Sequence, residues 1–337
     1  MAVMTFREFY TTVVPNEIEC HRFLVAKGLL KSAEDNDPCH KCGTEMQVKR
    51  RKCRNGEWKS IFRCPKKGCQ TTRSPRAGSS FFHFTDLNQR CNSGLTLCQI
   101  VELVFMFVLE LPTQMVMDRT GRSNECVTDW FNMCREVCTA ILKTKGKMVG
   151  NVQNPIQIDE ARFAGRRKYN RGRLLAGDAP SALTDINSEV INNRNHGARV
   201  DGPWVFGLKN GNDCRYFYVH RRYRETLLPI IERECEAGSE IHSDEWAAYR
   251  CRTSRGFVHK TVNHQISYVD ANTGAHTQNI ERSWLDAKIK LLKKMRGVPL
   301  NHLQSHLDHY CGRLYRQDSP DLFLAMLEDI QIVNNRF

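Results

Sequence analysis

The sequence predicts a mixed α/β domain in the second half of the chain, preceded by a cysteine-rich module and a group of helices. Apolar runs of strand length, at residues 155–159, 204–210 and 240–244, alternate with segments of helical periodicity. Two of these runs end in aspartate, so acidic side chains are expected at strand ends. Strands that alternate with helices indicate a sheet covered by helices.

Five segments of the chain differ in composition and periodicity. A chain of 337 residues is long enough for two or three domains with a substantial core. We expect an N-terminal helical segment, a zinc ribbon, a helix-turn-helix-like helical domain, the α/β domain and a C-terminal helical tail, at residues 1–37, 38–80, 90–145, 152–315 and 316–337.

Positive charge is concentrated near the N-terminus. The net charge is +13, and residues 38–76 contain twelve Lys or Arg against two Glu. Solubility alone does not require such clustering, so we expect a polyanionic partner, most simply double-stranded DNA. The run KRRK at 49–52 could equally serve nuclear import. We expect a nuclear protein, or a cytoplasmic or nucleoid one if the source is bacterial. The candidate DNA contacts here are Lys49, Arg50, Arg51 and Lys52.

The chain has fifteen cysteines, and its N-terminus lacks the basic and apolar regions of a secretory signal. Thiols are therefore expected to stay reduced and to bind metal or to pack in cores. The most apolar segment, residues 95–111, is interrupted by Gln99 and Glu102 and is shorter than the ~20 residues of a membrane span. We expect a buried helix there and no membrane partner.

Two close cysteine pairs, in CHKCG at 39–43 and CPKKGC at 64–69, have the glycine-containing form of zinc knuckles. The segment between them predicts a hairpin with its turn at Asn55-Gly56. We expect a zinc ribbon in which Zn²⁺ supplies much of the folding free energy. The second pair is widely spaced, so His40 or Cys53 could replace one ligand, and unligated or redox-active thiols are the alternative. The expected ligands are Cys39, Cys42, Cys64 and Cys69.

Residues 95–142 predict three helices. The buried helix ends at Leu111-Pro112, a short helix ends at Gly121, and Ser123 or Asn124 can cap the third helix. A DNA-binding helix-turn-helix is one interpretation, and a plain three-helix packing unit is the alternative, because the third helix is not strongly basic. The apolar stripe of the third helix comprises Val127, Trp130, Phe131, Cys134 and Val137–Cys138.

The run at 155–159 predicts a buried strand that ends at Asp159. Strand alternation places Asp159 opposite Ile158, which favours it over the adjacent Glu160 as a site residue, although the two could exchange roles. The following residues 162–173 contain six Arg or Lys and no acid, and could form a second strand beside the first. A solvated charge run is the alternative. The candidate DNA contacts in it are Arg166, Arg167, Lys168, Arg171 and Arg173.

A hairpin around Gly211-Asn212, a helix containing Pro229 and a strand that ends at Asp244 follow. The last long helix carries Glu281 about 100° from its apolar stripe, so Glu281 can face a cleft at the sheet edge. Lysines of this helix, Lys288 included, are expected to point outward. The stripe comprises Ile280, Trp284, Ala287, Leu291 and Met295.

Asp159, Asp244 and Glu281 form a candidate metal site. Carboxylates brought within ~4 Å of one another repel by several kcal/mol per pair at an effective dielectric constant near 20. Divalent cations remove this repulsion, and oxygen ligands favour Mg²⁺ or Mn²⁺. Two such ions can activate an attacking oxygen and stabilise a departing one in phosphodiester displacement.

At this point the sequence resembles a family of DNA transposases, the Merlin superfamily with its bacterial relatives of the IS1016/IS1595 group. The matching motifs are the cysteine pairs, QIDEARFAGRRKYNRGR, WVFGL, HSDEWAAY and HTQNIERSW. The resemblance implies a ribonuclease-H-like catalytic domain, with Asp159, Asp244 and Glu281 as the catalytic, metal-binding triad. It also implies cut-and-paste chemistry at terminal inverted repeats. His276 and Asn279 match the motif and are candidates for residues that support the triad.

Two other functions are compatible with these residues. A host-adopted protein could bind specific DNA without cutting it, and a metal-dependent nuclease could cleave DNA without joining it. The complete set of acids favours an active transposase. Because joining two DNA ends calls for more than one active site, we expect a homodimer or a larger assembly.

Overall fold

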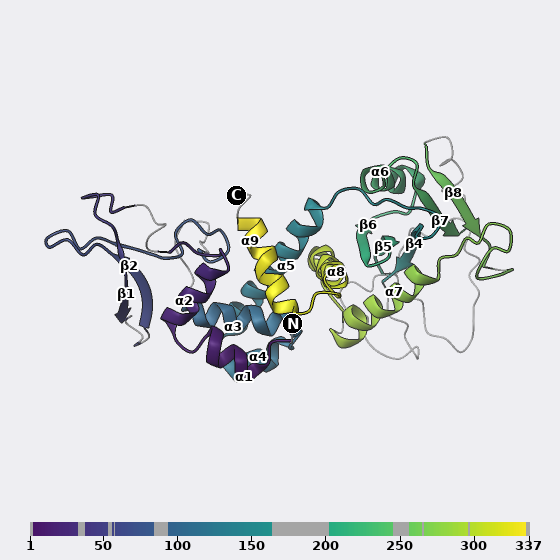
Figure 1. Cartoon of the computed structure of the whole chain (residues 1–337). Coiled ribbons are helices and arrows are strands. Elements are labelled where there is room, and N and C mark those ends of the chain that lie inside the picture. Colours follow the sequence, from purple (N-terminus) through teal and green to yellow (C-terminus); the bar gives the residue numbers. More distant parts are fainter. Residues whose placement is uncertain are drawn as a thin grey trace. The chain divides into compact units, whose positions relative to one another are not determined.

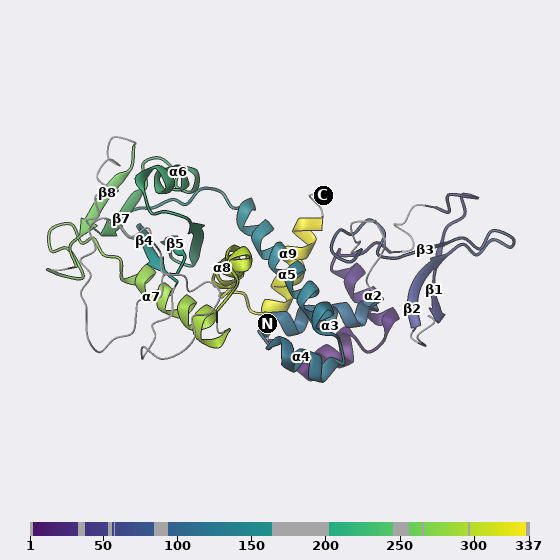
Figure 2. The same cartoon turned by 180° about the vertical axis from the view of Figure 1, so that it is seen from behind.

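The computed structural model forms two compact units, one of Met1–Lys143 with Arg316–Phe337 and one of Thr144–Tyr315. Figures 1 and 2 show their helices and strands from opposite sides. The structure describes residues 3–32, 38–52, 56, 58–83, 94–163, 202–244, 256–264, 266–295 and 297–334.

The core of the first unit is built by helices from both ends of its sequence. The rings of Phe9 and Phe105 stack with centroids 4.1 Å apart, and both meet Phe323 edge-on, at 5.5 and 5.3 Å. The C-terminal helix therefore packs into the same core as the N-terminal ones. The helices are α1 (Phe6–Glu8), the π-helical η1 (Phe9–Val13), α2 (Glu17–Ala26), α3 (Leu97–Val108), α4 (Thr113–Thr120), α5 (Asn124–Thr144) and α9 (Leu322–Asn334).

Helices α3 to α5 follow the predicted pattern of three helices. Most side chains of α3 are buried, as its apolar sequence predicted. Gly121 ends α4 with φ of 66°, and the Ser123 hydroxyl accepts the Cys126 N–H at 3.3 Å, so Ser123 caps α5. The predicted stripe of α5 is buried. Among the described residues, we find no helix with the length and apolar character needed to cross a membrane.

The cysteine-rich module is a small three-stranded antiparallel sheet in the order β1-β2-β3. It also packs on α2: the rings of His21 and Phe62 lie 5.8 Å apart, and the Ser60 hydroxyl donates to the Glu17 carbonyl at 3.4 Å. The predicted hairpin between the cysteine pairs is confirmed as β1 and β2. The strands are β1 (Gln47–Lys52), β2 (Trp58–Arg63) and β3 (Thr72–Arg73).

The second unit is a five-stranded mixed sheet in the order β6-β5-β4-β7-β8, which confirms the predicted α/β class. Strands β4, β5 and β6 form an antiparallel meander, whereas β7 and β8 run parallel to β4. The predicted hairpin at Gly211-Asn212 joins β5 to β6. The elements are β4 (Ile156–Arg162), β5 (Trp204–Asn210), β6 (Asp213–Val219), α6 (Arg224–Glu234), β7 (Glu240–Asp244), β8 (Val258–Val262), α7 (Gln278–Lys288), the π-helical η4 (Ile289–Lys294) and α8 (Leu300–Tyr315).

Helices cover both faces of this sheet (Figure 1). On one face, Leu227 and Ile231 of α6 share a core with Ile156 and Ile158 of β4. On the other face lie α7, which contacts β4 and β5, and α8, which contacts β6. Alternation along β4 therefore sends Ile158 toward α6 and Asp159 toward α7, which agrees with the predicted orientation of the strand.

Of two sequence-based expectations about local structure, one falls mainly outside the described residues and one is wrong. β4 continues past Asp159 to Arg162, and most of the segment 162–173, for which a second strand was predicted, lies outside the described residues. Met295 is 40% exposed, although it continues the apolar stripe of α7. The reason is the wider π-helical turn of η4, which shifts the positions that face the sheet.

Candidate active site and zinc module

Asp159 and Asp244 occupy neighbouring parallel strands. Ile156 of β4 pairs with Ile241 of β7, and the same register sets Asp159 beside Asp244, where β7 ends. Neighbouring strands lie ~4.8 Å apart. The sheet thus brings two half-buried carboxylates together from positions far apart in the sequence.

Asp159 is electrostatically coupled to both other acids. Burial raises its pKa from the ordinary 3.8 to about 7, and the negative charge of Asp244 and, more weakly, that of Glu281 add to the rise. The N–H of Glu160 and the indole N–H of Trp284, which lies 3.0 Å from Oδ2, oppose the rise by hydrogen bonding to the carboxylate. At neutral pH a substantial fraction of the metal-free protein therefore keeps a proton on Asp159, which a divalent cation can replace.

Glu281 enters the site from the first turn of α7. Its Oε1 accepts the Thr277 hydroxyl at 2.8 Å and lies 3.2 Å from Nε2 of His264. The same His264 nitrogen is 2.8 Å from the Thr277 hydroxyl oxygen. The side chain is 43% exposed and remains open to a ligand, while these contacts restrict its rotamer. A carboxylate in a first helical turn is also stabilised by the helix dipole.

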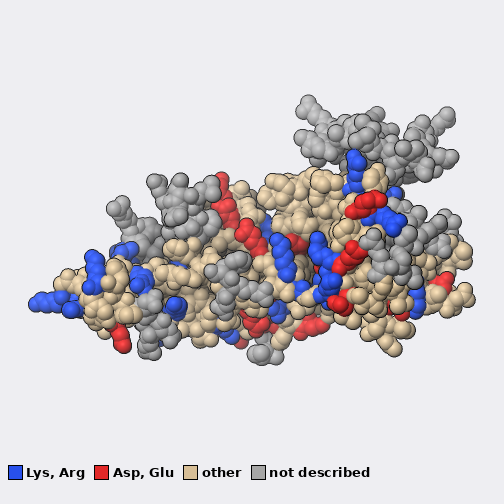
Figure 3. All heavy atoms as spheres, turned by 90° about the horizontal axis from the view of Figure 1, so that it is seen from above, with Lys and Arg blue, Asp and Glu red and all other residues tan. Residues whose placement is uncertain are grey.

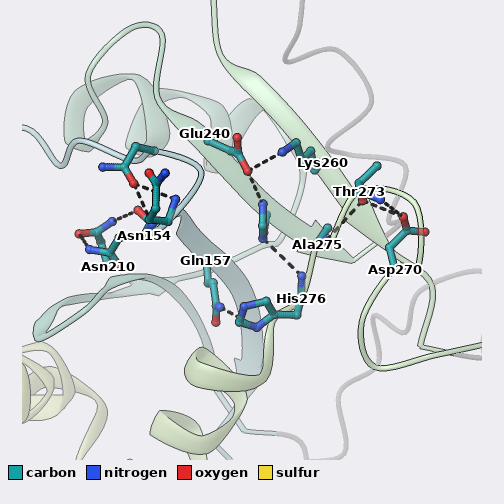
Figure 4. A network of polar contacts seen from close by, with 12 residues as sticks. Asn154, Gln157, Asn210, Glu240, Lys260, Asp270, Thr273, Ala275 and His276 are labelled. Carbon is teal, nitrogen blue, oxygen red and sulfur yellow. Dashed lines mark hydrogen bonds and ion pairs between the residues drawn. The ribbon is translucent and has the colours of Figure 1, made fainter.

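A chain of polar contacts ties the start of α7 to β4 and β7 (Figure 4). Gln157 of β4 accepts the Ile280 N–H through Oε1 at 3.1 Å, and its Nε2 lies 3.1 Å from Nδ1 of His276. The His276 N–H in turn donates to Nδ1 of His242 at 3.3 Å. Buried side chains of β4 and β7 therefore fix the position of α7, the helix that carries Glu281, relative to the sheet.

The donor and acceptor roles in this chain follow from its geometry. Because Gln157 uses its oxygen for Ile280, its NH₂ group donates to His276, whose Nδ1 must be unprotonated. Burial, and next the neighbouring His242, lower the pKa of His276, in agreement with a neutral ring. Nδ1 of His242 is likewise an acceptor, so its Nε2–H donates to Glu240 at 2.8 Å.

Trp284 lies flat against the sheet. Its ring stacks on Tyr216 with centroids 4.1 Å apart, and it passes over Gly207, the register partner of Asp159 on β5. A Cβ at Gly207 would stand only 2.6 Å from the indole ring. Gly207 therefore provides the space that lets Trp284 reach Asp159 with its N–H.

Sequence reasoning found the three acids but missed Gln157, Gly207, Thr277 and His264. Gln157 is a glutamine in an apolar strand and Gly207 is a glycine in the middle of another strand, and both features could have indicated a special role. No feature of the sequence indicated the role of Thr277 or His264, because that role depends on where α7 begins.

The other predicted site residues have mixed outcomes. His276 belongs to the polar chain at the start of α7, whereas Asn279 is exposed and, among the described residues, has no hydrogen bond to the acids. Lys288 does not point outward as predicted: it is half-buried, its Nζ lies 5.8 Å from the Phe163 ring, and it interacts electrostatically with Asp159. The predicted contacts Arg166, Arg167, Lys168, Arg171 and Arg173 lie outside the described residues.

The four predicted zinc ligands come together. Ligand atoms of Cys39, Cys42, Cys64 and Cys69 all lie within 4.8 Å of one another, with S···S distances of 3.5 Å for Cys39–Cys69 and 3.4 Å for Cys42–Cys64. Tetrahedral Zn²⁺ with bonds of ~2.3 Å separates sulfurs by about 3.8 Å, so the group fits this ion. The candidate replacements do not join it: His40 is exposed, and Cys53 lies outside the described residues.

Each of the four sulfurs accepts the backbone N–H of the residue two positions later, at Lys41, Thr44, Lys66 and Thr71. This bond lowers the pKa of Cys39, and the side chains and N–H groups of Thr44 and Thr71 lower those of Cys42 and Cys69. Burial raises the pKa of Cys64 to about 12. Amide donors aimed at sulfur stabilise thiolates, which is the state that binds Zn²⁺.

Cys64→Ser is expected to remove zinc from the protein. Wild type should contain about one Zn²⁺ per chain, because four thiolates close the coordination sphere, and the variant should lose both metal and ribbon structure. Elemental analysis and the absorption spectrum of the Co²⁺-substituted protein measure this. Cys126→Ser, a change of the half-buried thiol on α5, is the matched control. Equal zinc content in the two variants would contradict the assignment.

One edge of the cysteine-rich module is basic. We call this module, residues 39–73, the zinc module, because its four cysteines could hold Zn²⁺. β1 is an edge strand whose residues Lys49 to Lys52 are exposed, and none of them has an ion pair within the described part of the chain. The Arg50 guanidinium lies 5.7 Å from the ring of Trp58, which is 51% exposed. In Figure 3, Lys and Arg predominate over Asp and Glu on the visible face of the region around β1 and β2.

The exposed side of α5 has the opposite character. Glu125, Asp129 and Glu136 lie there, and most apolar side chains of the helix are buried in the core. Acids on a helix disfavour contact with phosphates. The electrostatics thus favour the packing interpretation of these three helices over the DNA-binding one.

The second unit is an α/β domain with Asp159 and Asp244 on neighbouring strands and Glu281 on the helix that crosses them. Residues 151–317 match the family model of the ISXO2-like transposase domain. The predicted resemblance to the IS1595-like group is thereby confirmed. No curated protein matches the chain.

Proposed function

We propose that the protein is a cut-and-paste DNA transposase that binds terminal inverted repeats, cleaves at them and transfers the freed strand to target DNA. The single observation that carries this proposal is the coupling of Asp159 to Asp244 and Glu281 within a domain of the transposase family. Three acids without a cation are electrostatically costly, and a nucleic-acid phosphodiester is the substrate that such a cluster serves with bound metal.

Asp159, Asp244 and Glu281 would hold Mg²⁺ or Mn²⁺. When bound, these ions supply activation of the attacking oxygen and stabilisation of the leaving one. The chain contributes the geometry: parallel β4 and β7 align the two aspartates, and the Trp284 N–H holds one oxygen of Asp159. Thr277 orients Glu281 from the side of α7.

We further propose a ribonuclease-H-like fold for this domain. An antiparallel meander joined to two parallel strands, with acids on the two central neighbours and a third acid on a helix across one face, supports this. Within the family we place the chain near the Merlin-like transposases, because Glu281 completes the acidic set, whereas some bacterial relatives have Asn at this place.

DNA recognition is assigned to the zinc module. Its exposed strand β1, with Lys49, Arg50, Arg51 and Lys52, is supported by a cysteine cluster that would rigidify it when zinc is bound. We propose a homodimer or larger assembly, since two element ends must be joined, and a nuclear location. A host-adopted DNA-binding protein is the second candidate, favoured by the fact that this basic edge lies in a different unit from the acids.

The test is incubation of purified protein with Mg²⁺ or Mn²⁺ and DNA that carries the flanking sequence of its own gene. Wild type and Asp244→Asn are compared on denaturing gels, with a second labelled duplex present to capture strand transfer. Metal-dependent cuts at the flanks and joined products, both absent from Asp244→Asn, are expected. Cuts without joining would indicate a nuclease, and binding without cuts would indicate the host-adopted role.

A further inference from the structure

A second basic surface lies in the α/β unit, between β6 and α6. The connecting residues 220–224 read HRRYR, and all of them except the half-buried Arg222 are exposed. Neither Arg221 nor Arg224 has an ion pair among the residues that the structure describes, and the Arg221 guanidinium lies 5.8 Å from the Tyr223 ring. The segment thus holds positive charge without neutralising acids at two positions.

An aromatic ring holds one arginine of this segment, Arg222, and a further arginine beside it, Arg162. The guanidinium groups of Arg162 and Arg222 lie 4.7 and 4.4 Å from the centroid of Trp204. Trp204 opens β5 and pairs with Arg162, the last residue of β4. Cation–π contacts restrict the arginine side chains, so less conformational entropy is lost when they bind an anion. We call Arg162, Trp204 and residues 220–224 the arginine–tryptophan cluster.

The cluster lies at the same end of the sheet as the acids. β6 runs parallel to β4, so residues 220–224 follow the carboxyl end of β6, two strands from β4. Two strand spacings amount to about 10 Å. Arg162 is three residues beyond Asp159 on β4, which is also about 10 Å along a strand. The register sets Tyr216 of β6 level with Asp159, so Arg221 also lies five residues, about 16 Å, farther along the strand direction. Alternation turns Arg162 toward the α6 face, opposite to Asp159, so DNA held at the acids reaches the cluster around the edge of the sheet, within one helical turn of about 34 Å.

The chemistry of the cluster favours a phosphodiester backbone. Guanidinium groups bind phosphate oxygens bidentately, and exposed aromatic rings next to them accept sugars or bases. The acids cannot attract a polyanion by themselves, because their own charge repels it in the absence of metal. A separate positive surface at the same end of the sheet can attract the polyanion in their place.

We propose that the arginine–tryptophan cluster binds the DNA backbone on one side of the bond to be cut, and so positions that bond over the acids. This inference rests on the proposed transposase function, since it takes the acids as the place of cleavage. It assigns Arg221 and Arg224 as phosphate contacts, with Arg162, Arg222 and Trp204 as their rigid support.

The experiment measures binding of a short fluorescein-labelled DNA duplex in EDTA, at several salt concentrations, by fluorescence anisotropy. Zinc is first shown to be retained under these conditions. Wild type is compared with Arg221→Ala, Arg224→Ala and the double variant. Arg233→Ala is the matched control, because it removes an exposed arginine from the opposite end of α6 with the same change in net charge. Vesicles containing phosphatidylserine are tested in parallel.

Each substitution in the cluster is expected to lower the slope of log K against log salt by about 0.9, and the double variant by about twice that. Arg233→Ala should leave the slope near the wild-type value. Equal slopes for all variants would overturn the proposal, as would a loss of vesicle binding with DNA binding intact. Because the assay needs no cleavage, an inactive protein that shows the slope changes would contradict the transposase function and leave this DNA surface standing.

Discussion

Asp159→Asn is expected to abolish metal-dependent DNA cleavage, whereas Glu160→Gln should retain it. Asp159 points toward α7 and Asp244, and its neighbour Glu160 alternates to the other face of β4. Loss of one metal-binding carboxylate should lower the cleavage rate by about three orders of magnitude or more, equivalent to at least ~4 kcal/mol of transition-state stabilisation. Single-turnover cleavage on denaturing gels measures both variants. Equal losses in the two would contradict the orientation of β4.

The same pair of variants has a signature in thermal unfolding. The folded pKa of Asp159, about 7, exceeds its ordinary value of 3.8, so the folded protein binds more protons than the unfolded one between these pH values. Wild type without divalent metal should therefore lose stability as pH rises through this window, and Asp159→Asn should lose less. At pH 8, Mg²⁺ or Mn²⁺ should raise the Tm of wild type and of Glu160→Gln, but not that of Asp159→Asn.

Gly207→Ala is expected to destabilise the α/β unit and to impair cleavage, although the substitution adds a single methyl group. The new Cβ would lie 2.6 Å from the Trp284 ring and 2.9 Å from the Tyr216 ring, so the stacked rings must shift. Overpacking of this kind costs about 1–3 kcal/mol, a fall in Tm of several degrees. Gly146→Ala is the control, because a Cβ there would meet nothing within 4 Å.

A double variant separates lost space from the lost hydrogen bond. The ring atoms nearest to the Gly207 position, Cζ2 and Cη2 of Trp284, are absent from phenylalanine. Gly207→Ala should therefore cost less stability in a Trp284→Phe background than in wild type, a non-additivity that thermal melts detect. Cleavage should stay low in that background, since phenylalanine cannot donate to Asp159. Additive losses of stability would show that the two residues do not share this contact.

Much of the candidate site could be predicted because its signals are local. Asp244 ends a short apolar run, and alternation along 155–159 separates Asp159 from Glu160, so strand periodicity alone orients these acids. The knuckle glycines and cysteine spacing likewise specify a tetrahedral thiolate group within a few residues on each side. The apolar stripe of α7 could be predicted from α-helical periodicity only as far as η4, because the periodicity changes in this π-helical turn.

Other features had no local signal. The pairing of β4 with β7 depends on which strands compete for one edge of β4, and short segments carry little information on that choice. The contact between Trp284 and Gly207 appears only once α7 crosses β5.

The sequence by itself determined the α/β class and the group of four cysteines, and it predicted the three candidate acids, because each follows from periodicity or spacing within one segment. Only the tertiary structure decided the register that sets Asp159 beside Asp244, and the anchoring of α7 through Gln157 and His242. These depend on contacts between residues far apart in the chain, whose free energy is gained only when the sheet and the helix have packed together.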